Sequence, residues 1–240
     1  MVATRSWSTE QVSNIHPYTD EAGPRSEDQV GRQTDQHASS MVNLLHSLEP
    51  ALARVQTGRS ILFSSARPGE GKTTLVSQFA SMLLQNTSSR VAVIDAGLRC
   101  DLSTQQEPRS QLPLDQLIAR LQKNGRGEGR SNADGRRALV TATVNTPDSR
   151  AIVEQAASWA ELKVAFDYVL VEMPSLADSP LAVGTAKYFD GVVLVIEAGR
   201  TRWPIAQNAQ VQLERAGGTV LGAFLNKRVY HVPESLYRRL

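Results

Sequence analysis

The most informative segment of the chain reads Ala66-Arg67-Pro68-Gly69-Glu70-Gly71-Lys72-Thr73. It follows a short apolar run at residues 61–65 and precedes residues 73–85, whose apolar side chains recur at helical spacing. A Gly-Lys-Thr sequence between a predicted strand and a predicted helix is typical of a loop whose backbone N–H groups surround phosphates. We call residues 66–73 the phosphate loop and expect it to bind the phosphates of ATP.

Each residue type in this loop has a physical role in binding phosphates. Gly69 and Gly71 allow the backbone to turn so that successive N–H groups converge on one anion. The helix that follows directs its positive end at the same anion. Lys72 is expected to contact the β- and γ-phosphates, and the Thr73 hydroxyl to bind Mg²⁺. Ala66 stands where the common pattern has glycine, which requires a negative φ at this residue. The nucleotide contacts assigned here are Arg67, Pro68, Gly69, Glu70, Gly71, Lys72, Thr73 and Thr74.

Strands and helices alternate along the rest of the sequence. Further strands are predicted at residues 91–94, 138–144, 168–172, 191–196 and 219–225, and further helices at 39–56, 114–123, 149–165 and 204–216. This order is typical of an α/β fold in which helices flank a doubly wound, mostly parallel sheet. Ligands in such sheets bind at the carboxyl ends of the strands.

The ends of the chain differ in composition from this central region. Residues 1–38 are polar and show no regular period, which predicts a disordered N-terminal tail. Residues 39–226 are expected to form one domain, with Pro50 as a possible kink in its first helix. Residues 124–130 are rich in glycine and predict a flexible surface loop. Residues 227–240 form a C-terminal tail that carries Tyr230 and Tyr237.

Charge and cysteine content limit the classes of function. The 26 basic and 24 acidic residues nearly balance, which argues against a protein dedicated to nucleic-acid binding. Cys100 has no second cysteine with which to form an internal disulfide, so a reducing compartment is expected. No run reaches the roughly 18 apolar residues of a membrane-spanning helix. We expect a cytoplasmic protein, which does not prevent docking on a membrane protein.

Acidic residues end two of the predicted strands. Asp95 follows the second strand, which is expected beside the strand of the phosphate loop. Its carboxylate is suited to a water-mediated Mg²⁺ contact or to activating a nucleophile, although Asp also commonly caps the next turn. Glu172 ends the strand at 168–172 as a second metal ligand, or as a strand-end acid without a metal. The catalytic candidates are thus Lys72, Asp95 and Glu172.

Five stretches together resemble the bacterial tyrosine kinases of capsule and exopolysaccharide synthesis. The resemblance covers residues 60–226 and extends to the ParA and MinD ATPases, which are related to these kinases. In the kinase family, an Asp-x-Asp-x-Arg motif follows the second strand, whereas this chain reads Asp95-Ala96-Gly97-Leu98-Arg99. The family's later strand ends in Asp, whereas this chain has Glu172. The five stretches are residues 64–74, 93–99, 166–174, 190–201 and 220–226.

The resemblance implies a set of ligands and roles. ATP and Mg²⁺ are the implied cofactors, and Thr73, Asp95 and Glu172 are the implied metal ligands. Asn226 is implied to read the edge of adenine, although asparagine is equally favoured in turns. Tyr230 and Tyr237 are the available phosphoacceptors. Gly97 removes one family carboxylate, which leaves phosphoryl transfer open.

Two functions from different classes follow. The first is an ATP-binding protein of capsule or exopolysaccharide biosynthesis, acting as a tyrosine autokinase or as a degenerate regulatory ATPase. It would be a homo-oligomer, would bind no nucleic acid, and would lie at the inner membrane through the cytoplasmic tail of a membrane copolymerase, or chain-length determinant. The alternative is a ParA/MinD-like ATP-dependent positioning protein, which predicts a basic surface patch. A third possibility is a scaffold whose phosphate loop is vestigial.

Overall fold

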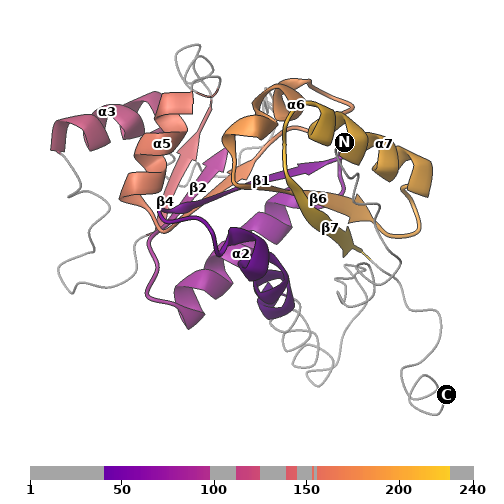
Figure 1. The fold of residues 1–240 in the computed structure, drawn as a ribbon, viewed down its shortest axis with the longest axis horizontal. Coiled ribbons are helices and arrows are strands. Elements are labelled where there is room, and N and C mark those ends of the chain that lie inside the picture. Colours follow the sequence, from indigo (N-terminus) through magenta and orange to yellow (C-terminus); the bar gives the residue numbers. More distant parts are fainter. Residues whose placement is uncertain (1–40, 98–111, 125–138, 145–152, 154–155, 228–240) are drawn as a thin grey trace, which may run out of the picture.

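The structure is a computed structural model that describes residues 41–97, 112–124, 139–144, 153 and 156–227. Seven parallel strands form one sheet in the order β3-β4-β2-β5-β1-β6-β7. The α/β fold with a parallel sheet flanked by helices, expected from the sequence, is confirmed (Figure 1). The tail at 1–38, most of the loop at 124–130, Tyr230 and Tyr237 lie outside the described residues.

The strands and helices alternate along the chain as predicted, with small differences at their ends. The strands are β1 (Arg59–Ser65), β2 (Val91–Asp95), β3 (Leu112–Pro113), β4 (Leu139–Thr143), β5 (Tyr168–Glu172), β6 (Gly191–Glu197) and β7 (Val220–Asn226). The helices are α2 (Lys72–Asn86), α3 (Leu114–Asn124), α5 (Ala156–Ala165), α6 (Leu181–Thr185), the short 3-10 helix η3 (Ala186–Tyr188) and α7 (Trp203–Arg215). A further helix includes residues 41–52.

Helices cover both faces of the sheet (Figure 1). The helix at 41–52 and α2 pack on one face, where Leu48, Phe79 and Phe63 join one apolar core. Helices α3, α5, α6 and α7 pack on the other face, where Trp159 and Leu213 join a second core. Strands that are covered on both faces are largely apolar, which is why residues 61–63 of β1, 168–171 of β5 and 192–196 of β6 read as continuous apolar runs.

Two expectations about the elements need correction. The first helix ends at residue 52 rather than 56 and includes Pro50, whose missing N–H lies close to the end of the helix. The elements β3, α6 and η3 were not predicted, because segments of 2, 5 and 3 residues are too short to show a period. No described helix has both the length and the apolar character needed to cross a bilayer.

The order of the strands decides which residues meet at the phosphate loop. Strand β1 leads into this loop and lies between β5 and β6. Strand β2 pairs with β5 and β4 instead. The expectation that Asp95 lies beside the strand of the phosphate loop is therefore wrong, because β5 is inserted between them. Apolar runs show that strands exist, but they do not show which strands are neighbours.

Candidate nucleotide-binding site

The backbone of the phosphate loop has the glycine conformations that its sequence predicts. Gly69 and Gly71 have φ values of 80° and 88°, which residues with a side chain rarely adopt. A Cβ atom at Gly71 would lie 2.1 Å from the side-chain nitrogen of Asn226. Ala66 keeps a negative φ, as its place in the loop requires, since Lys227 is the one described non-glycine residue with a positive φ.

Helix α2 begins at Lys72, directly after the loop. The Lys72 Nζ donates a hydrogen bond to the Ser65 hydroxyl at 2.8 Å, and this hydroxyl donates to the carbonyl of Arg67 at 2.7 Å. The Thr73 hydroxyl donates to Glu172 Oε1 at 2.6 Å. The first turn of α2 thus lies against the carboxyl ends of β1 and β5, which brings the predicted Lys72, Thr73 and Glu172 together.

The buried side chain of Glu70 stabilises the phosphate loop through hydrogen bonds within the protein. Its side chain is 1% exposed. One carboxylate oxygen accepts the backbone N–H of Arg67 at 2.8 Å. The other accepts the N–H of Glu197 at 3.0 Å and the hydroxyl of Thr201. The Glu70 side chain therefore ties the loop to the turn that follows β6.

The end of β7 also contacts the loop. Asn226 is 6% exposed, and its Nδ2 donates to the carbonyl of Glu70 at 2.9 Å. Its Oδ1 accepts the N–H of Lys227 at 2.9 Å. Lys227, with φ 53°, donates from Nζ to the carbonyl of Gly69 at 2.7 Å. Asn226 thus fixes the position of the phosphate loop, and its contact with adenine stays a prediction.

A cavity of about 530 Å³ opens in front of the loop. This volume lies in the range of pockets that hold cofactors and small ligands. The phosphate loop and α2 form one wall of the cavity, and the segment after β5 forms another. Its lining residues are Pro68, Gly69, Gly71, Lys72, Thr73, Thr74, Gly97, Glu172, Met173, Pro174, Ser175, Asp178, Ser179 and Lys227.

Several predicted site residues do not line this cavity. Arg67, Glu70, Asp95 and Asn226 are absent from its walls. Asp95 lies opposite Glu172 on the neighbouring strand, and its Oδ1 accepts the N–H of Gly97 at 2.8 Å. This is the turn cap that the sequence offered as the alternative role for Asp95. Arg67 is exposed.

Sequence reasoning missed Ser175, Asp178, Ser179 and Lys227. Three of them belong to the segment that follows the carboxyl end of β5, and Lys227 follows the carboxyl end of β7. The rule that ligands bind at the carboxyl ends of parallel strands points to both positions. This rule could have pointed to both segments, but Ser175, Asp178, Ser179 and Lys227 match no motif.

The parallel sheet, the strand–loop–helix unit and the cavity at the carboxyl ends of the strands define a P-loop nucleotide-binding fold. No family model matches the chain. The kinase domain of the Escherichia coli tyrosine kinase ETK superposes with a TM-score of 0.58 at 20% identity, covering 82% of this chain and 78% of that chain. At this identity the likeness shows the fold alone.

Curated relatives give the closer assignment. The chain is 30% identical over 182 residues to the succinoglycan biosynthesis transport protein ExoP of Rhizobium meliloti. It is 27% identical over 172 residues to the tyrosine-protein kinase CpsD of Streptococcus agalactiae. Each match covers 70% of this chain, and they span 22% of ExoP and 74% of CpsD. The chain is therefore a homologue of bacterial tyrosine kinases, and the resemblance stated from its motifs is confirmed.

Proposed function

We propose that the chain is an ATP-binding protein of capsule or exopolysaccharide biosynthesis that transfers or hydrolyses the γ-phosphate. The observation that carries the proposal is the phosphate loop facing a cavity with Lys72, Thr73 and Glu172 on its walls. A lysine and a helix N-terminus attract a polyphosphate, and a neighbouring carboxylate suits a hard cation. The names of ExoP and CpsD support the pathway and the tyrosine-kinase activity.

The donor set fits Mg²⁺ bound together with a nucleotide. The Thr73 hydroxyl and the Glu172 carboxylate, which are hydrogen-bonded to each other, supply two hard oxygens. No group of three His, Cys, Asp or Glu among the described residues is placed to hold a metal. Phosphate oxygens and water would therefore complete the shell, as is usual for Mg²⁺. When bound, the ion neutralises charge on the β- and γ-phosphates.

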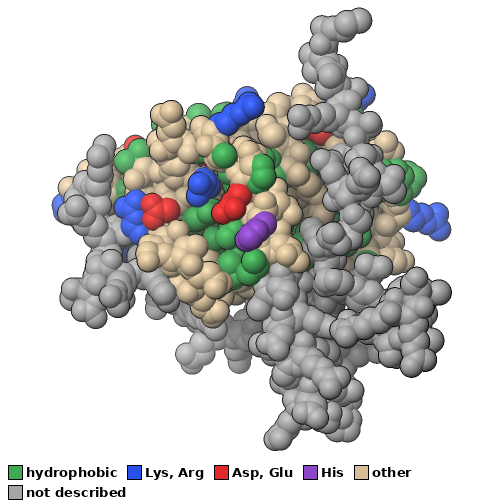
Figure 2. Space-filling view, turned by 60° about the horizontal axis from the view of Figure 1, so that its bottom comes forward, with side chains coloured by type: hydrophobic (Ala, Val, Ile, Leu, Met, Phe, Trp, Pro, Cys, Tyr) green, Lys and Arg blue, Asp and Glu red, His purple; other side chains and the backbone are tan. Residues whose placement is uncertain are grey.

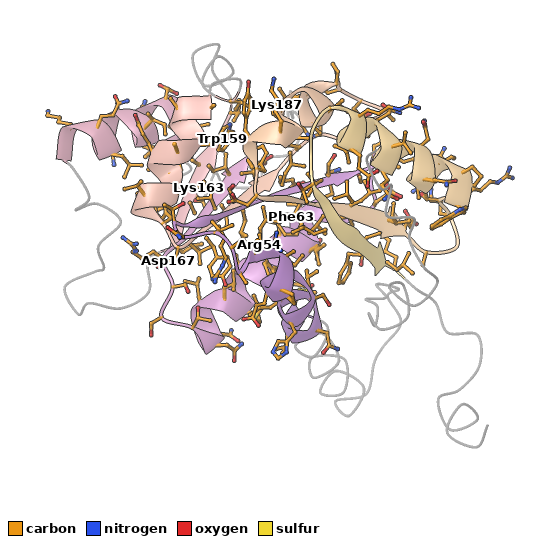
Figure 3. The ribbon with its side chains drawn as sticks, in the orientation of Figure 1. Arg54, Phe63, Trp159, Lys163, Asp167 and Lys187 are labelled. Atoms are coloured by element: carbon orange, nitrogen blue, oxygen red, sulfur yellow. The ribbon has the colours of Figure 1, made fainter. Side chains whose placement is uncertain are left out.

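The binding proposal is tested by thermal unfolding with and without ATP and Mg²⁺. Ligand binding to the folded state raises stability by about 2.7 kcal/mol at a hundredfold excess over the Kd, so the wild-type Tm should rise. Lys72→Ala should lose most of this ATP-dependent rise in Tm. Lys187→Ala is the matched control, because Lys187 is exposed in η3 and does not line the cavity (Figure 3). If ATP leaves the Tm of the wild type unchanged, a scaffold with a vestigial phosphate loop is favoured.

Tyrosine phosphorylation is the finer part of the proposal. Tyr230 and Tyr237 are the phosphoacceptors that the tail offers. Incubation with ATP labelled at the γ-phosphate should label the wild type, and Tyr230→Phe/Tyr237→Phe should abolish this label. Persistent label on the double variant would reject autophosphorylation at these residues. ATP consumption without any label would identify a regulatory ATPase.

The proposed partner is the cytoplasmic tail of a membrane copolymerase, bound by a homo-oligomer at the inner membrane. The transport function in the name of ExoP supports this partner. Light scattering with and without ATP should show a change in oligomeric mass, and co-purification with the copolymerase tail should depend on Lys72. A mass that is monomeric in both nucleotide states would contradict the assembly.

The ParA/MinD-like alternative predicts a basic patch for DNA or an anionic membrane. On the face shown in Figure 2, the described Lys and Arg side chains are separated by acidic, apolar and other surface rather than gathered together. This face therefore offers no support for the alternative. ATP-dependent binding to DNA or to anionic vesicles would revive it.

A further inference from the structure

The described walls of the cavity carry neither carboxylate of the family's Asp-x-Asp motif: Asp95 was predicted beside the phosphates, and Gly97 stands at the position of the second acid. Asp95 does not line it, and its Oδ1 is bonded to the backbone N–H of Gly97. Gly97 lines the cavity without a side chain. A Cβ atom at Gly97 would lie 2.9 Å from Asp95 Oδ1, so a side chain at this position would require a shift of the neighbouring carboxylate. Neither position 95 nor position 97 therefore supplies an acid to the described walls of the cavity.

Among the described residues, two carboxylates line the cavity, those of Glu172 and Asp178. Glu172 accepts the hydroxyl proton of Thr73 at 2.6 Å, which places it on the side where the metal is proposed. Asp178 lies on the wall formed by the segment after β5. Of these two acids, Glu172 is hydrogen-bonded to the proposed metal ligand Thr73, and Asp178 is hydrogen-bonded to Ser175.

The segment that carries Asp178 is fixed to the strand that leads into the phosphate loop. The Leu176 N–H donates to the carbonyl of Ser65 at 2.9 Å, and the Ser64 hydroxyl donates to the carbonyl of Pro174 at 2.8 Å. The fully buried Ser175 donates its hydroxyl to Asp178 Oδ2 at 2.5 Å. These bonds hold the Asp178 carboxylate at a set position relative to the end of β1.

We propose that Asp178 is the general base of the phosphoryl transfer, in place of the acid missing at position 97. This inference rests on the proposed function. The acceptor hydroxyl, of water or of a tyrosine, gives its proton to the Asp178 carboxylate as its oxygen bonds the γ-phosphorus. The bond from the γ-phosphorus to the bridging oxygen breaks, and its electron pair leaves with ADP. Ser175 positions the carboxylate through its hydrogen bond.

The described charged side chains that share the cavity with Asp178 are those of Lys72, Glu172 and Lys227. An ionised carboxylate accepts a proton, whereas the amide of Asp178→Asn does not. The substitution keeps the size of the side chain and its ability to accept the Ser175 hydroxyl.

The test compares the wild type, Asp178→Asn, Asp178→Glu and the matched control Asp167→Asn, with Asp167 placed away from the cavity at the other end of the sheet. ATP affinity is measured by calorimetry, and γ-phosphate transfer or release by single-turnover kinetics across pH. General bases contribute roughly 10²–10⁴-fold. Asp178→Asn should therefore lose at least about a hundredfold in rate, keep its Tm and ATP affinity, and lose the fall in rate at acid pH. Asp178→Glu should recover part of the rate, and Asp167→Asn should match the wild type in rate and in ATP affinity.

Each other outcome overturns the assignment of Asp178. An unchanged rate in Asp178→Asn would show that no proton passes to this residue. A loss of ATP affinity or of Tm together with the rate would show that Asp178 only holds the turn. If the wild type binds ATP but neither transfers nor releases its γ-phosphate, there is no reaction for Asp178 to catalyse, and only the proposal of nucleotide binding stands. A wild type that binds no ATP would refute the proposed function itself.

Discussion

Charged and hydrogen-bonding side chains gather at both ends of the sheet, but they have different neighbours. At the amino ends of the strands, Lys163 pairs with Asp190 at 2.7 Å, and Arg90 pairs with Asp167 at 3.0 Å; Lys163 and Asp167 are labelled in Figure 3. At the carboxyl ends, Lys72, Glu172 and Asp178 line a cavity. The residues at the amino ends form ion pairs within the protein, whereas the three residues at the carboxyl ends lie on the walls of the cavity.

The pair at the amino end also shows how the balance of effects sets a pKa. Burial alone would raise the pKa of the Asp167 carboxyl, but hydrogen bonds from Arg90 and the charges of Arg90 and Arg59 outweigh it and lower the pKa. The hydrogen bond to Asp167 raises the pKa of Arg90. Both residues are therefore held in their charged forms.

The largest expected effect is at Glu70, which belongs to the carboxyl end but faces the protein. Glu70→Ala should leave the N–H groups of Arg67 and Glu197 and the hydroxyl of Thr201 without this acceptor. Loss of such bonds to a buried carboxylate should lower the free energy of unfolding by about 3 kcal/mol. Urea titration measures this, and calorimetry should show weaker ATP binding. Glu70→Gln, which keeps one acceptor, should lose less; equal stability of Glu70→Ala and wild type would contradict the role of Glu70.

A smaller effect is expected at Asp190, at the amino end. Its carboxylate accepts the N–H and the hydroxyl of Ser60, both at 2.8 Å, and the Nζ of Lys163. Asp190→Ala should lower the free energy of unfolding by about 2 kcal/mol. Because Asp190 is remote from the cavity, the ATP affinity of the folded fraction should not change. A loss of ATP affinity in Asp190→Ala would contradict the distinction between ion pairs at the amino ends of the strands and cavity residues at their carboxyl ends.

The smallest effect is expected at Asp167, where the ion pair is partly exposed. Because the folded-state pKa is lowered, its contribution is present above the ordinary carboxyl pKa of about 3.9 and is lost as pH falls through the folded-state pKa. Asp167→Asn should therefore cost less than about 1 kcal/mol at neutral pH. The variant should lose less stability than wild type on acidification, as measured by urea titration at several pH values. If the free energies of unfolding of the variant and the wild type fall in parallel as pH is lowered, the contribution assigned to the Asp167 carboxylate is contradicted.

The features that could be predicted from the sequence depend on local patterns. Strands β1, β5 and β6 are buried on both faces, so their apolar runs are visible in the sequence. Lys72 and Thr73 follow from the spacing of the phosphate loop. The neighbours of β2 and the contacts of Glu70 depend on strands far apart in the chain, so no local pattern encodes them. Asp178 matches no motif, and only the fold shows that its segment is bonded to the end of β1.

The contacts of the phosphate loop also order events during synthesis of the chain. The ribosome makes Gly69 and Glu70 early, but their carbonyl groups receive the side chains of Lys227 and Asn226 from 158 and 156 residues later in the chain. At roughly 5–20 residues per second, this delay is roughly 8–30 seconds. The nascent chain therefore carries its nucleotide site in an incomplete form until the last strand has left the exit tunnel.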